Sequence, residues 1–85
     1  MKIVWDEPKR LANLDKHGLD FADLQPEFFY VSAILPAKSG RLQAIGEVDD
    51  QIVSVIFTTL GREAISIISM RRAGKSEKRR FHDQA

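Results

Sequence analysis

The chain of 85 residues has no cysteine, which predicts a single domain over residues 1–85 and excludes disulfides and cysteine-based metal sites. Its first residues lack the apolar stretch of a signal peptide, and no apolar run reaches the length of a membrane span, so we expect a cytoplasmic protein. The formal net charge of +1 is unevenly distributed, because residues 71–85 have six Lys/Arg and two Asp/Glu whereas residues 1–70 have seven Lys/Arg and ten Asp/Glu.

The N-terminal residues predict a short strand followed by a helix. Residues 1–5 are β-prone. Asp6 is a good helix cap and Pro8 is tolerated in a first turn, so we expect the helix to begin here. It is expected to end at His17, with Gly18 in the left-handed conformation that closes many helices.

The helical pattern indicates which side of this helix faces the core. Leu11 and Leu14 are three residues apart and are expected to be buried, whereas Asn13 is expected on the solvent side. Asp20 opens a second short helix, which Pro26 interrupts or restarts. Four apolar side chains of this region are predicted core residues: Phe21, Leu24, Phe28 and Phe29.

The second half of the chain is mostly strand. The pattern predicts strands over residues 30–35 (a short edge strand), 41–48, 52–59 and 64–70. Short connections between the last three make them antiparallel. Ser76 is expected to cap a last helix over residues 77–84. The predicted fold class is therefore α+β in the order β-α-α-β-β-β-α, with an antiparallel sheet of about four strands, two N-terminal helices on one face and a short C-terminal helix.

The sequence has no P-loop, dinucleotide fingerprint or nucleophile elbow, and its two histidines are too far apart to predict a metal site. His17 and Lys16 stand at the expected end of the first helix. A histidine there has a tunable pKa and is a candidate general acid or base. The commoner role for both side chains is to bond the last carbonyls of the helix.

Arg71 and Arg72 follow an apolar strand without a linker, so they are expected at its exposed end. A guanidinium group suits phosphate because it donates two parallel hydrogen bonds. Neighbouring side chains of a strand point to opposite faces, so only one of the two can lie on a given face. For one of them we expect a salt bridge with Glu47, Glu63 or Asp49.

The remaining basic residues extend this pattern. Arg41 and Arg62 each adjoin a glycine near a strand end, and Arg79 and Arg80 lie on the last helix with Glu77. A cationic surface on an acidic body attracts polyanions. Solvated surface charge is the commoner explanation for each of these arginines, and electrostatic support of the helix is the commoner role of Glu77.

Three blocks of sequence resemble BrnT-type toxins over nearly the whole chain, in order. Residues 5–9 and 13–21 match the opening W-D-x-x-K…N-x-x-K-H-G-(I/V)-x-F, residues 41–46 match the strand R-x-x-x-I-G, and residues 65–81 match the ending I-S-x-R-x-A-x-x-x-E…Y. There are departures from the pattern. Ser66 replaces an arginine of many members, Phe81 replaces a tyrosine, and residues 60–62 follow the family's R-G turn only loosely.

The resemblance implies a RelE-like ribonuclease toxin of a type II toxin–antitoxin system, which would inhibit translation and growth. It implies metal-independent RNA cleavage by 2′-OH attack with no cofactor, and neutralisation by a ribbon-helix-helix, BrnA-like antitoxin whose complex binds operator DNA. The catalytic candidates are Lys16, His17, Arg71, Arg72 and Glu77. The RNA-binding candidates are Arg41, Arg62, Arg79 and Arg80.

Two alternatives use the same basic C-terminal segment. A nucleic-acid-binding protein without catalytic activity would bind RNA or DNA in a salt-dependent manner. A protein-interaction module would bind an acidic partner and leave RNA unaffected.

Overall fold

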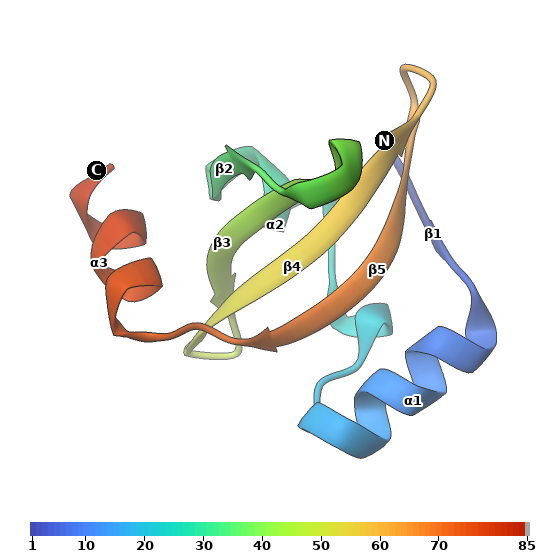
Figure 1. The fold of residues 1–85 in the computed structure, drawn as a ribbon, viewed down its shortest axis with the longest axis horizontal. Helices are drawn as coiled ribbons and strands as arrows, with labels where there is room; N and C mark the ends of the chain where they lie inside the picture. Colours follow the sequence, from blue (N-terminus) through green and yellow to red (C-terminus); the bar gives the residue numbers. More distant parts are fainter. Residues whose placement is uncertain (85) are drawn as a thin grey trace.

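The computed structural model describes residues 1–84, which form a single five-stranded sheet with helices around it (Figure 1). The strands are β1 (Lys2–Trp5), β2 (Ala33–Pro36), β3 (Leu42–Val48), β4 (Gln51–Leu60) and β5 (Ala64–Arg72), in the sheet order β1-β5-β4-β3-β2. The helices are α1 (Glu7–His17), α2 (Pro26–Val31) and α3 (Lys75–Asp83), with 3₁₀ turns at residues 21–23 and 38–40. None of these helices has the length and apolarity needed to cross a membrane.

The α+β class is confirmed, and each of the five segments predicted to be extended contains a strand. The predicted sheet of about four strands, all antiparallel, is wrong. The order β-α-α-β-β-β-α omits one of the five strands, and β1 pairs with β5 in parallel, from Lys2 opposite Ala64 to Trp5 opposite Ile67. The other three pairings are antiparallel. Short connections force antiparallel pairing only between consecutive strands. The helical segment between β1 and β2 lets the chain place these two strands at opposite edges of the sheet.

The second predicted helix is divided into two pieces. The Asp20 side chain accepts a backbone N–H at 2.9 Å and caps the 3₁₀ turn at residues 21–23. Pro26 then starts α2, which continues to Val31. Because the chain is still helical there, β2 begins at Ala33, three residues later than predicted.

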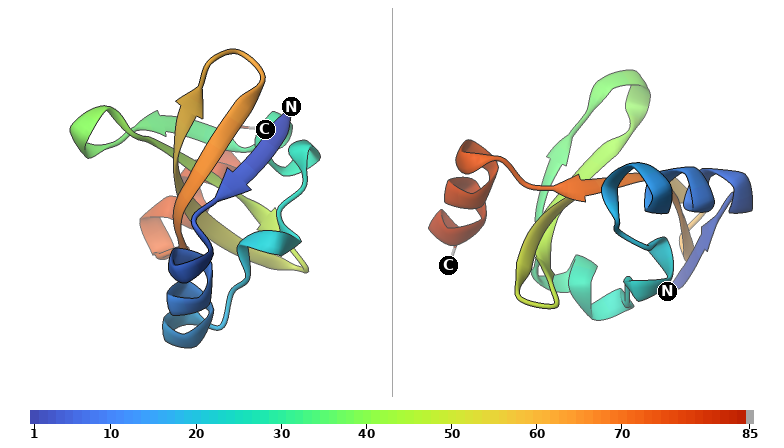
Figure 2. Two further views of the ribbon diagram at one scale, coloured as in Figure 1. Left: turned by 90° about the vertical axis from the view of Figure 1, so that its right-hand side faces the viewer. Right: turned by 90° about the horizontal axis from the view of Figure 1, so that it is seen from below.

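The main core lies between one face of the sheet and residues 19–29. The four predicted core residues of this segment are confirmed as buried, as are the alternating side chains Val53, Val55 and Phe57 of β4. A smaller apolar cluster lies on the opposite face, where Phe81 of α3 packs against Ile45 and Ala33. The twisted sheet is therefore covered by α2 on one face and by α3 at one end of the other (Figure 2).

The ends of α1 are as predicted, but its orientation is not. Asp6 caps the helix by accepting the backbone N–H of Lys9 at 3.3 Å, and Gly18 closes it with φ 68°. The expected apolar face is wrong, because Leu11 is 52% exposed and Leu14 is 37% exposed. The helix presents another side to β5.

Asn13, expected in solvent, is 7% exposed and joins α1 to the edge of β5. β1 pairs with β5 only as far as Ile67, so the main chain beyond that point has no neighbouring strand on this side within the part of the chain that the structure describes. The Asn13 amide takes the strand's place: Oδ1 accepts the Met70 N–H at 3.0 Å, and Nδ2 donates to the Met70 carbonyl at 2.9 Å and the Leu19 carbonyl at 3.1 Å. These bonds satisfy buried backbone groups directly before Arg71.

Candidate active site

The C-terminal end of β5 lies between α1 and α3 (Figures 1 and 2). It presents Arg71 and Arg72, which continue the strand and therefore point to opposite faces. Arg71 contacts Glu77 of α3, whereas Arg72 contacts the last residue of α1. The expectation that only one of the two arginines lies on each face agrees with these contacts.

Arg71 and Glu77 form a bidentate ion pair. The Arg71 Nη1 and Nη2 groups donate to Glu77 Oε1 and Oε2, each at 2.8 Å. The salt bridge expected for one of the two arginines is thus present, but the predicted partners Glu47, Glu63 and Asp49 are wrong. Those carboxylates lie near the turns of the sheet, while α3 turns back across the end of β5 and brings Glu77 to it.

The ion pair uses only one edge of the Arg71 guanidinium group, which has five N–H donors in a rigid plane. Nη1 and Nη2 face Glu77, and Nη1 also donates to the Arg72 carbonyl at 3.2 Å. The Nε–H and the outer Nη2–H lie side by side on the remaining edge and meet no acceptor within residues 1–84. Since the side chain is 48% exposed, this edge can donate two parallel hydrogen bonds to a phosphate.

Glu77 receives four hydrogen bonds. Besides the two from Arg71, its carboxylate accepts the Gly74 N–H at 2.9 Å and the Gln43 Nε2 group at 2.8 Å. The Arg71 bonds, with smaller contributions from Gly74 and Gln43, lower the pKa of Glu77 from 4.5 to about 2. A carboxylate of such low basicity is a weak proton acceptor at neutral pH. Its bond to Gly74 also caps α3, which starts at Lys75, so the predicted cap at Ser76 is wrong.

Gln43 and Ser54 belong to this cluster, although no motif in the sequence marks them as site residues. Gln43 Nε2 donates to Ser54 Oγ at 2.8 Å as well as to Glu77, and Ser54 lies opposite Arg71 in the sheet. Strand alternation indicates only that Gln43 faces away from the main core. Ser54 lies beside Arg71 because of the register in which β4 pairs with β5, and local sequence patterns do not give that register.

Arg72 joins β5 to α1 on the other side. Its Nη1 group donates to the His17 carbonyl at 3.1 Å and its Nε to Gln51 Oε1 at 2.8 Å. Arg72 thus caps the end of α1, the role that the sequence suggested for Lys16 and His17 themselves. Within residues 1–84, neither of those two side chains makes a hydrogen bond or ion pair, and Lys16 is exposed.

The structure does not bring the other predicted RNA-binding arginines to this cluster. Arg62 lies in the turn before β5, and Ala64 is seven residues from Arg71, about 23 Å at ~3.3 Å per residue. Arg41 directly precedes β3, also toward that end of the sheet. Arg79 and Arg80 line a separate groove beside β2.

Comparisons with known proteins agree with the resemblance of the motifs. The family model described as "Ribonuclease toxin, BrnT, of type II toxin-antitoxin system" matches residues 5–77. The crystal structure of the Brucella abortus ribonuclease toxin BrnT is similar to this chain, with a TM-score of 0.82 and 56% sequence identity over 88% of this chain and 99% of that one. No curated protein sequence matches the chain.

Proposed function

Because the chain belongs to the BrnT family of ribonuclease toxins of type II toxin–antitoxin systems, we propose that it cleaves RNA by 2′-OH attack without a metal ion. The 2′-oxygen forms a bond to the adjacent phosphorus and the bond to the 5′-oxygen breaks. A base takes the 2′ proton, and an acid protonates the leaving 5′-oxygen. The need for the 2′-OH restricts the reaction to RNA.

The observation that supports this proposal is the open edge of Arg71. Its Nε–H and outer Nη2–H would bind two phosphate oxygens and stabilise the charge that develops on phosphorus. Glu77 is then a positioning residue, since its two bonds fix the plane of the guanidinium group before substrate arrives. Gln43 holds Glu77 in turn.

The proton-transfer groups are proposed at the end of α1. Glu77, with a pKa of about 2, is a weak candidate for the base. Lys16 and His17 follow the part of α1 that Asn13 ties to Met70, and the Arg72 bond fixes the His17 carbonyl beside the end of β5. Arg72 would therefore act mainly as a positioning residue for this pair.

The rest of the prediction stays a proposal. Membership of the family implies an antitoxin partner. We propose a ribbon-helix-helix antitoxin that neutralises the toxin and binds operator DNA with it, a RelE-like mode of action, and inhibition of translation in the cytoplasm.

Incubation of the purified protein with total RNA in EDTA tests the nuclease proposal. We expect cleavage by the unchanged chain and a loss of about 100-fold or more for Arg71→Ala. Arg71→Lys keeps the charge but not the planar fork and should be nearly as inactive. Lys9→Ala removes an exposed cation from the first turn of α1 and serves as the matched control.

Four results would contradict parts of this scheme. Cleavage that EDTA abolishes would refute a metal-independent reaction. Full activity of Arg71→Lys would refute the role of the fork, and undiminished activity of His17→Ala would remove that side chain from proton transfer. Salt-dependent RNA binding without cleavage would favour the non-catalytic alternative.

A further inference from the structure

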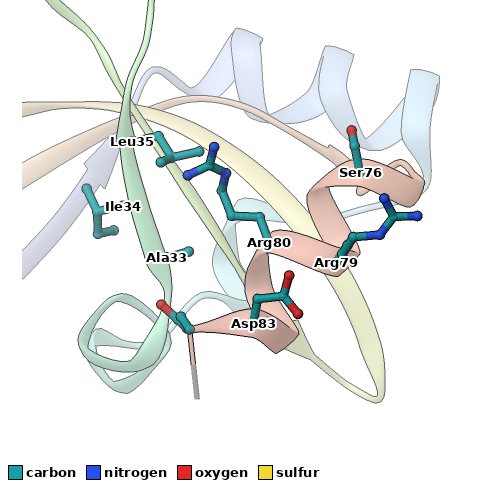
Figure 3. Close-up of a pocket in the computed structure, with 8 residues that line it drawn as sticks. Ala33, Ile34, Leu35, Ser76, Arg79, Arg80 and Asp83 are labelled. Atoms are coloured by element: carbon teal, nitrogen blue, oxygen red, sulfur yellow. The ribbon is translucent and has the colours of Figure 1, made fainter.

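A groove of about 560 Å³ lies between the edge strand β2 and helix α3 (Figure 3), and neither Arg71 nor Glu77 is among the residues that line it. β2 contributes three consecutive apolar residues to it, and α3 contributes residues that recur every three or four positions and so share one helix face. The lining residues are Ala33, Ile34, Leu35, Ser76, Arg79, Arg80, Asp83 and Gln84.

The groove includes the free edge of β2. Neighbouring side chains of a strand point to opposite faces, so three consecutive residues line one groove only where it reaches around an edge. In Figure 3 the Arg80 side chain extends toward Leu35, while Ile34 points away from α3. β2 pairs with β3 alone and is the last strand of the described sheet, so its outer edge presents main-chain groups that another strand can bind.

Both walls of the groove are fixed. Phe81 packs α3 against the small apolar cluster under the sheet, and Gln84 Nε2 donates to the Val31 carbonyl at 2.9 Å. Next to this anchor, Tyr30 and Val31 are 69% and 65% exposed, and Ile34 is 44% exposed. An apolar strip therefore continues from the groove onto the neighbouring surface.

The residues that line the groove carry a net positive charge. Within residues 1–84, Arg79 and Arg80 make no hydrogen bond or ion pair, in contrast to Arg71. Asp83 is the one acidic residue among those that line the groove. Two guanidinium groups beside an apolar strand edge complement a segment that combines carboxylates with apolar side chains.

We propose that this groove binds an acidic segment of the antitoxin, which adds to β2 as a further strand. Its carboxylates would pair with Arg79 and Arg80, and its apolar side chains would cover Ile34 and Leu35. Addition of a strand to a sheet edge is a common mode of peptide binding, in which the main chain supplies affinity and the side chains supply specificity. RNA fits the groove less well, because its floor is aliphatic and offers no flat ring on which a base would stack.

The proposal rests on the antitoxin pairing proposed above and is tested separately from cleavage. The probe is the purified small protein encoded next to this chain, with binding measured by calorimetry and RNA cleavage measured on the free chain. Arg79→Ala/Arg80→Ala should raise the Kd for that protein by about tenfold or more and leave cleavage unchanged. Ile34→Asp, at an exposed position, should weaken binding similarly.

Two further variants serve as controls. Lys2→Ala/Lys9→Ala removes the same charge from β1, at the opposite edge of the sheet, and from α1, and should bind normally. Arg71→Ala should lose cleavage but keep the partner. Thermal melts of all variants confirm that they fold.

The outcomes separate the two proposals. Unchanged binding by Arg79→Ala/Arg80→Ala, or an equal loss of affinity in the Lys2→Ala/Lys9→Ala control, would overturn the proposal that the groove binds the antitoxin. If Arg79→Ala/Arg80→Ala also loses RNA cleavage, the groove binds RNA, and the proposed antitoxin site is overturned. If the chain binds the small protein encoded next to it through the groove but cleaves no RNA, the nuclease proposal fails while this inference stands.

Discussion

Replacement of Asn13 by alanine tests how α1 is attached to the sheet, and with it the position of the Arg71 end of β5. The amide supplies three hydrogen bonds to buried main-chain groups of Met70 and Leu19. Asn13→Ala leaves the Met70 N–H and both carbonyls without that partner. Among residues 1–84, no other strand lies at this edge to replace it.

The expected cost follows from these groups. A buried backbone group left unpaired costs about 1–3 kcal/mol, and the better helix propensity of alanine returns about 0.5 kcal/mol. Three such groups at the lower limit of this range, less the helix contribution, predict that Asn13→Ala lowers the free energy of unfolding by about 2.5 kcal/mol or more. In a domain of this size, 1 kcal/mol corresponds to a Tm shift of about 4–8 °C, so the loss is large.

Leu11→Ala is the matched comparison on the same helix. Its side chain is 52% exposed, and alanine is at least as good a helix former as leucine, so the change should stay within about 0.5 kcal/mol. Urea unfolding at neutral pH, followed by circular dichroism and by the fluorescence of the one tryptophan, Trp5, measures both variants. A greater loss for Leu11→Ala than for Asn13→Ala would refute the observed orientation of α1 and restore the one that the leucine pattern predicts.

Three further predictions concern the sheet and the site. Because the pKa of Glu77 is lowered from 4.5 to about 2, its contribution to the free energy of unfolding is present above pH 4.5 and is lost as the pH falls toward 2. Glu77→Gln should remove about 1–2 kcal/mol of this pH dependence after solvent screening is allowed for. Identical acid-unfolding curves for the two proteins would contradict the ion pair. Gly46→Ala should cost about 1–3 kcal/mol, because its Cβ would lie 2.7 Å from Phe28 Cε2; an unchanged urea midpoint would show that α2 can move away. Gln43→Ala should raise the Glu77 pKa, measured by NMR titration, and reduce RNA cleavage several-fold with little change in Tm. An unchanged Glu77 pKa in this variant would remove Gln43 from the site.

The sequence by itself determined the local structure. Asp6 and Gly18 mark the ends of α1 as predicted, and Asp49 and Asp50 form the β3–β4 turn with φ values of 50° and 65°. Each of these features depends on hydrogen bonds and backbone preferences within a few residues, which local patterns report. The motif resemblance likewise identified the family, because it compares residues without the need for their contacts.

The tertiary structure decided which distant residues meet. The leucine spacing of α1 indicated the wrong buried face, because the partner of Asn13 is the main chain of Met70, 57 residues away, and a hydrogen bond to a strand edge leaves no periodic signal. The parallel pairing of β1 with β5 and the choice of Glu77 as partner of Arg71 have the same origin. Such contacts depend on strand register and on the path of the whole chain, so they form and stabilise the fold only once the strands are paired.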